Sequence, residues 1–83
     1  MSQLVRSPKQ LGVALRRSRR TQAMTQADLA SRAGVRQGTI SHVENGLETV
    51  KLNTVMDLLR ALDLEIVVRQ RTKGSHSDIE DLF

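Results

Sequence analysis

Residues 25–46 read TQADLASRAGVRQGTISHVENG, and this stretch decides the fold that the 83-residue chain is expected to adopt. Thr25 followed three residues later by Asp28 is a capping-box pattern, which predicts the start of a helix. Gly34 is expected to end that helix, because glycine readily takes the left-handed conformation that closes a helix C-terminus. The residues expected to face inward are Leu29, Ala30 and Ala33.

A second helix is predicted at roughly 37–45, with Ile40 and Val43 facing inward and Asn45-Gly46 ending it. The two helices meet at a short turn that begins with glycine. Counted from Gln26, the fifth residue is small, the ninth tolerates a turn, and the fourth, eighth, fifteenth and eighteenth are apolar. Together these positions form a helix-turn-helix pattern. The alternative is an ordinary antiparallel helical hairpin.

The exposed side of the second helix favours DNA binding over the plain hairpin. Its residues are small or form hydrogen bonds, and none is a carboxylate: Arg36, Gln37, Gly38, Thr39, Ser41 and His42. A solvated helix face usually carries Asp or Glu, whereas a helix in the DNA major groove carries a carboxylate only where it reads cytosine. The pattern therefore predicts that this helix binds DNA.

Two further helices are predicted around this pair. Ser7-Pro8 is a helix start, with serine as the cap and proline at the first helical position, and the helix is expected to run from 8 to about 21. An apolar stripe at helical spacing predicts a fourth helix. The stripe consists of Leu52, Val55, Met56, Leu59 and Leu62.

Apolar residues on alternate positions follow the fourth helix. Leu64, Ile66 and Val68 show the period of a β-strand over about 64–70. A lone strand leaves its backbone N–H and C=O groups without partners, so we expect it to pair with the same strand of a second subunit. The alternative is that the helix continues. The residues expected to form the dimer contact are Leu64, Ile66, Val67 and Val68.

Length and composition favour an all-α domain of four to five helices, completed by this C-terminal strand. The domain is expected to span residues 1–71, and residues 72–83 form a flexible acidic tail. The chain has no cysteine, tryptophan or tyrosine, and its one phenylalanine is Phe83, so the core is expected to be aliphatic without a disulfide. Such a small domain often relies on a second copy, which also indicates a homodimer.

Charge is divided unevenly along the chain. Residues 1–43 contain eight basic and one acidic residue, a net charge of +7, whereas residues 44–83 contain five basic and eight acidic residues, a net charge of −3. The basic half indicates a polyanionic partner, although basic residues can also simply solvate a helix. There is no signal region and no apolar run near the ~20 residues that span a bilayer, so we expect a cytoplasmic, nucleoid-associated protein without membrane contact.

The sequence offers nothing for catalysis. It lacks cysteine, a glycine-rich phosphate loop and a histidine-rich metal spacing, so no catalytic, cofactor or metal residues are predicted. We therefore expect a binding protein and not an enzyme.

The stretch TQADLASRAGVRQGTISHVENG resembles the helix-turn-helix of the Cro/cI-type (XRE-type) repressors, and the similarity extends over about residues 8–63. More narrowly, the layout resembles the HipB-type antitoxins. Ser-Pro opens the first helix, a single strand is expected at the end of the stretch LLRALDLEIVV, and a polar tail follows. This resemblance implies a homodimer whose subunits are joined by a β-lid. It also implies that the dimer represses its own operon. It further implies the antitoxin of a type II toxin–antitoxin module, which neutralises a HipA-type serine/threonine kinase toxin. The alternative is a stand-alone phage- or restriction-type regulator without a toxin partner.

Two positions depart from the repressor pattern. Where that family commonly has glycine, this chain has Ala23, so the first helix is expected to end without a favoured left-handed residue. Where the family often has serine before the fourth helix, this chain has Lys51. That helix start is therefore expected to be uncapped, at a cost of about 1 kcal/mol.

The residues expected to bind double-stranded DNA, at a palindromic operator, fall into two groups. Arg36, Gln37, Ser41 and His42 are the expected readers of base edges, since arginine fits guanine and glutamine fits adenine. Gly38 would let the backbone approach a thymine methyl group or a phosphate closely, unless it is only a tolerated surface defect. The expected phosphate contacts are Thr39, Asn45 and, by the resemblance, Gln26.

Other charged residues have separate expected roles. The resemblance implies that Arg19 pairs with Glu44 beneath the turn. Arg16, Arg17 and Arg20 add phosphate contacts or only long-range attraction, and the sequence leaves this choice open.

The end of the tail combines Ile79, Leu82 and Phe83 with acidic residues at a helical spacing. We expect this segment to dock on the toxin as a short amphipathic motif. The alternative is a disordered tail that only aids solubility.

Overall fold

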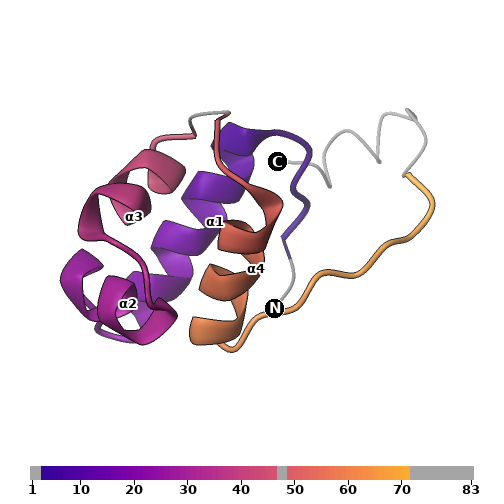
Figure 1. Ribbon diagram of the computed structural model, residues 1–83. Helices are drawn as coiled ribbons and strands as arrows, with labels where there is room; N and C mark the ends of the chain where they lie inside the picture. The colour runs from indigo at the N-terminus through magenta and orange to yellow at the C-terminus, as the bar shows by residue number, and fades with distance from the viewer. Residues whose placement is uncertain (1–2, 47–48, 72–83) are drawn as a thin grey trace.

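Four helices make up the regular structure of the computed structural model, which describes residues 3–46 and 49–71. They are α1 (Pro8–Thr21), α2 (Gln26–Ala33), α3 (Gln37–Glu44) and α4 (Leu52–Ala61). In Figure 1, α2 and α3 lie on one side of α1 and α4 lies on the other. Helix α3 packs on both α1 and α2, and α2 also packs on α4. The prediction of an all-α helix-turn-helix fold is confirmed.

Local hydrogen bonds place the helix ends where the sequence predicted them. The Ser7 hydroxyl accepts the backbone N–H of Gln10 at 3.1 Å and caps α1. Thr25 and Asp28 form the capping box of α2, with bonds of 2.9 and 3.0 Å. Gly34 closes α2 with φ 72°, so the sharp turn between α2 and α3 uses the left-handed conformation that glycine takes without steric cost.

The core is aliphatic, as the composition predicted. Its fully buried side chains are Leu15, Leu29, Ile40, Leu58 and Leu62. These residues come from all four helices and from the end of α4, so the two short helices of the motif are fixed on a common core.

The apolar stripe that predicted α4 is buried at three of its five positions. Leu52 is 70% exposed and Met56 is 49% exposed, whereas Leu58, outside the predicted stripe, is 1% exposed. The apolar surface of α4 is wider than the area that the other helices cover. The buried face is therefore rotated towards Leu58, and Leu52 and Met56 form an uncovered apolar edge.

Both departures from the repressor pattern are visible in the backbone. We expected α1 to end without a favoured left-handed residue, and the structure keeps a left-handed turn there nevertheless, with Ala23 at φ 57°. Lys51 stands at the N-cap of α4 without a side-chain capping bond, as predicted. The first position carries backbone strain, and the second leaves helix N–H groups without a capping acceptor.

Gly12 allows α1 to approach the end of α3, a feature that the sequence reasoning missed. A Cβ atom at this position would lie 2.5 Å from the carbonyl oxygen of Val43 and 2.7 Å from that of Glu44. No side chain fits in that space. Glycine at this position is therefore required by the helix crossing.

The segment after α4 is not part of a sheet within residues 3–46 and 49–71. Residues 64–71 have no regular hydrogen-bonded structure, and Figure 1 shows them leading away from the four helices. The expected strand needs a partner strand for its backbone groups, and the described residues of this single chain offer none. In the part of the chain that the structure describes, no helix is both long and apolar enough to span a membrane.

Candidate nucleic-acid interface

Helix α3 turns one side to the core and the other outward. Ile40 and Val43 are buried, whereas Arg36, Gln37 and Gly38 at the start of the helix are exposed. The predicted site residues on the later turns are half-buried or exposed: Thr39, Ser41, His42 and Asn45. The structure therefore collects seven of the eight expected DNA-binding residues on and beside one helix.

The start of α3 is open to a ligand. Arg36 occupies the N-cap, and its side chain makes no capping bond to the helix. Around Gly38, a Cβ atom would find no other atom within 4 Å, so this glycine faces open space. Among the described residues, nothing blocks the space next to Gly38, so a large ligand such as a nucleic-acid duplex can come close to the backbone of the first turn of α3.

The later turns of α3 already use some of their polar atoms. His42 Nε2 lies 3.1 Å from the Thr49 hydroxyl, and Asn45 Nδ2 lies 3.5 Å from Ser41 Oγ. Because a histidine nitrogen that contacts a hydroxyl is less free to read a base edge, His42 has mainly its other ring nitrogen for that role. Arg36 and Gln37 are the less constrained of the predicted readers.

A buried ion pair joins α1 to the end of α3. Arg19 Nε and its NH2 group donate to the two carboxylate oxygens of Glu44, at 2.6 and 3.1 Å. The NH1 group of Arg19 donates to the carbonyl oxygen of Met24 at 2.7 Å. Both residues of the pair are at most 9% exposed. The pairing that the family resemblance implied is confirmed, and it also fixes the turn between α1 and α2.

Glu44 also connects to the eighth predicted site residue. Gln26, the first residue of α2, donates from Nε2 to Glu44 Oε1 at 3.2 Å and is half-buried. This contact brings the start of α2 to the end of α3. The sequence reasoning named Gln26 and Glu44 for separate roles and missed their contact, because residues 18 positions apart carry no local signal of it.

Titration of the ion pair follows from its contacts. The hydrogen bond to Glu44 raises the pKa of Arg19. Burial alone would raise the pKa of the Glu44 carboxyl, but hydrogen bonds from Arg19 and Gln26 outweigh it, so this pKa lies below its ordinary value. The nearby charge of Arg16 lowers it further. Both members of the pair are therefore charged at neutral pH.

The exposed surface of α3 has no carboxylate, and the reason is structural. The one acidic residue between 36 and 45 is Glu44, and it is buried and paired. Arg36 stays exposed at the start of this surface, and Arg16, Arg17 and Arg20 are exposed on α1. Among these α1 arginines, the charge of Arg16 acts on Glu44. The surface thus offers hydrogen-bond donors and positive charge, which suit a polyanion.

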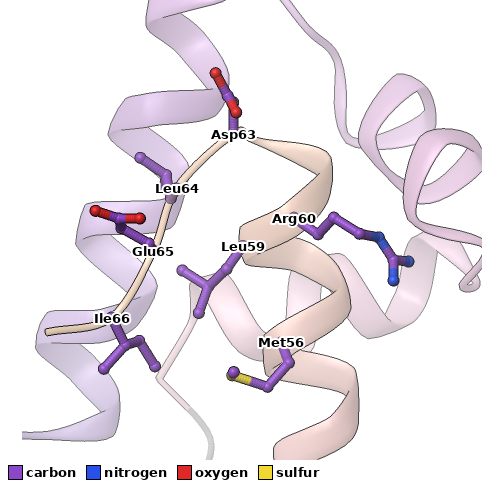
Figure 2. A pocket seen from close by; sticks show the side chains of 7 residues that line it. All are labelled: Met56, Leu59, Arg60, Asp63, Leu64, Glu65 and Ile66. Atoms are coloured by element: carbon purple, nitrogen blue, oxygen red, sulfur yellow. The ribbon is translucent and has the colours of Figure 1, made fainter.

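A shallow groove of about 400 Å³ lies elsewhere, between α4 and the segment that follows it. Figure 2 shows Met56 and Leu59 of α4 and Ile66 of the following segment along it.

Within the described residues, no group of three or more histidine, cysteine, aspartate or glutamate side chains is placed to hold a metal ion.

A family model described as a helix-turn-helix domain matches residues 10–72. Antitoxin HipB of Escherichia coli K12 is 32% identical over 78 residues, which cover 94% of this chain and 89% of that protein. An uncharacterized HTH-type transcriptional regulator, y4dL of Sinorhizobium fredii, is 44% identical over 54 residues, which are 65% of this chain and 28% of the longer relative.

Solved structures agree with these sequence matches. A complex of a HipB variant with an O2 20mer contains a chain that superposes with a TM-score of 0.81 at 33% identity, covering 87% of this chain and 100% of the other. A HipA-HipB-O2-O3 complex gives 0.79 at 32% identity, with coverages of 86% and 100%. The restriction-modification controller protein C.AhdI from Aeromonas hydrophila gives 0.65 at 31% identity, with coverages of 70% and 84%.

Proposed function

The chain belongs to the helix-turn-helix family, in the group that contains the HipB antitoxins, and we propose that it is a sequence-specific DNA-binding repressor and the antitoxin of a type II toxin–antitoxin module. Its activity is binding, and no catalytic step is assigned to it. In this proposal it represses its own operon and neutralises a HipA-type kinase toxin.

The observation that carries the proposal is the outward surface of α3. Between Arg36 and Asn45 every exposed side chain is neutral or basic, and Glu44 is withdrawn into the ion pair with Arg19. Phosphates repel exposed carboxylates, so a surface without them suits the major groove. A HipB variant of similar fold was solved in a complex with an O2 20mer, and this likeness supports the proposal.

Within this surface we assign different tasks to different residues. Arg36 and Gln37 read base edges, and Ser41 and His42 add contacts on the next turn. Gly38 allows close approach of the backbone. Phosphate contacts that set the position of the protein on the duplex are assigned to Gln26, Thr39 and Asn45.

We further propose that the protein is a homodimer. Ile66, Val67 and Val68 are 52, 73 and 93% exposed, and Leu64 and Met56 are also exposed beside the groove in Figure 2. A second copy would cover these side chains, and pairing of residues 64–70 between subunits would satisfy their backbone groups. Such a dimer presents two α3 helices about 34 Å apart to a palindromic operator.

The toxin-binding part of the proposal concerns the end of the chain. We place the DNA-binding and dimerising domain at residues 1–71 and assign toxin docking to Ile79, Leu82 and Phe83 of the tail at 72–83, which lies outside the described residues. The HipA-HipB-O2-O3 complex of the relative supports a HipA-type partner. Deletion of residues 74–83 should abolish toxin neutralisation and preserve repression; a deletion that leaves neutralisation intact would contradict the docking role.

A gel-shift assay with the protein's own promoter region tests the DNA-binding assignment. Arg36→Ala and Gln37→Ala should each weaken specific binding by about 1–3 kcal/mol and relax sequence preference. Arg60→Ala is the control, because Arg60 is an exposed arginine of α4 in an ion pair with Asp57. Unchanged affinity in both α3 variants would remove the assignment of this surface.

The alternative is a regulator without a toxin partner. The similarity to the restriction-modification controller protein C.AhdI supports it. Two observations decide between the functions: whether a kinase gene adjoins this gene, and whether that kinase co-purifies with the protein and loses its toxicity on co-expression. The stand-alone regulator predicts neither.

A further inference from the structure

We infer that Glu44 is a positioning residue for DNA binding: it holds the Gln26 side chain in one orientation, ready to donate a hydrogen bond to a backbone phosphate. This inference rests on the proposed function. It assigns to the buried ion pair a task beyond joining α1 to α3, and it makes the phosphate contact depend on residues that never touch DNA.

The orientation of Gln26 follows from the chemistry of its partner. An ionised carboxylate only accepts hydrogen bonds, so Glu44 Oε1 must face the Nε2 group of Gln26, at 3.2 Å, and not its carbonyl oxygen. Nε2 carries two hydrogens, and one is used by Glu44. The second N–H group remains for another acceptor, on a half-buried residue at the N-terminal end of α2.

Arg19 makes this arrangement compatible with an anionic ligand. It donates to both oxygens of Glu44, so the carboxylate next to the proposed phosphate position carries no unbalanced charge. Its bond to the Met24 carbonyl fixes the turn directly before α2. Glu44 is thereby held by two hydrogen bonds from Arg19, and it can in turn orient Gln26.

The benefit to binding is entropic. A glutamine on a protein surface samples several rotamers, and a ligand that immobilises it must offset the lost freedom. Here the rotamer is already selected when the protein folds, so the phosphate contact forms without that cost. The contact is neutral, and it should therefore add affinity without adding to the number of counterions released.

A mutant cycle tests the inference. The double change Arg19→Met/Glu44→Met replaces the buried pair by apolar side chains, which folded proteins often tolerate. We expect Gln26→Met to weaken binding to the promoter duplex about three- to tenfold per half-site, with an unchanged salt dependence. Arg19→Met/Glu44→Met should cause a similar loss, and combining it with Gln26→Met should add nothing further.

Gln22→Met is the matched control for this cycle. Gln22 also links two elements, since its Nε2 donates to the Leu62 carbonyl at 2.8 Å, but it is outside the proposed interface. It should change the melting temperature and leave DNA affinity unchanged. Losses that add in the combined variant would overturn the positioning role. A wild-type protein that binds no duplex would overturn the proposed function and this contact together.

Nuclear magnetic resonance of the wild-type protein gives a test that does not depend on a variant that folds. The side-chain NH2 signals of Gln26, assigned in the wild-type protein through its own backbone resonances, should lie apart from those of the exposed Gln37 before DNA is added. They should change little in the DNA complex except at the hydrogen that meets the phosphate. Signals averaged like those of Gln37 would contradict a preset orientation.

Discussion

At the scale of single residues, Ala23 carries the clearest strain. Its φ of 57° is left-handed, a region that costs a residue with a Cβ atom about 1–2 kcal/mol. We predict that Ala23→Gly raises the free energy of unfolding by about 1 kcal/mol, measured by urea denaturation. Asp63→Gly is the comparison, because Asp63 has φ 58° but aspartate tolerates this region better, so its gain should be smaller. A loss of stability in Ala23→Gly would contradict the strain.

Gly38 separates a residue's contribution to folding from its contribution to binding. Its surroundings are empty and it lies within α3, so Gly38→Ala should stabilise the protein by about 1 kcal/mol in thermal unfolding. The same change should weaken DNA binding in the gel-shift assay, because a methyl group would stand between the backbone and the duplex. Gly34→Ala is the control and should destabilise, since φ there is 72°. Undiminished DNA affinity in Gly38→Ala would leave this glycine without a functional role.

At the scale of helices, the four N-termini are unequal. α1 and α2 have side-chain caps, whereas the N-cap residues of α3 and α4, Arg36 and Lys51, make no side-chain capping bond. The missing cap of α3 lies within the proposed DNA surface, where free N–H groups favour a phosphate. The missing cap of α4 has no such use, so that helix start can be improved without loss of binding.

Lys51→Ser should therefore increase stability by about 1 kcal/mol, because serine supplies an acceptor to the first turn of α4. It also removes a positive charge from a helix N-terminus. Lys51→Ala distinguishes the two causes, since it removes the charge and adds no cap, and its gain should be smaller. Equal melting temperatures for the serine and alanine variants would show that no capping bond forms.

At the scale of the whole molecule, the exposed apolar edge of α4 and residues 64–68 after it form the proposed dimer contact. Ile66→Lys should shift the protein from dimer to monomer in sedimentation equilibrium and weaken operator binding, because one α3 helix then binds alone. Val13→Lys is the control: Val13 is 47% exposed, close to the 52% of Ile66, but lies on α1. It should leave the dimer intact. A dimer that survives Ile66→Lys would contradict the proposed role of residues 64–68.

The sequence by itself determined where α1 and α2 start and where α2 ends. The Thr25–Asp28 capping box, the Ser7 cap and the Gly34 turn each depend on groups within a few residues of one another. Such signals can be recognised from a few neighbouring residues alone, and for that reason they were predicted correctly. The same locality explains the correct prediction of an aliphatic core with Ile40 and Val43 inward.

Only the tertiary structure decided which apolar residues of α4 are buried, and which polar residues meet. A helical period defines a face, but the neighbouring helices determine how much of it they cover, so Leu58 is buried and Met56 is not. The contact of Gln26 with Glu44 and the close approach at Gly12 also join residues that are far apart in the chain. Their geometry depends on the crossing of α1, α2 and α3, which no local pattern specifies.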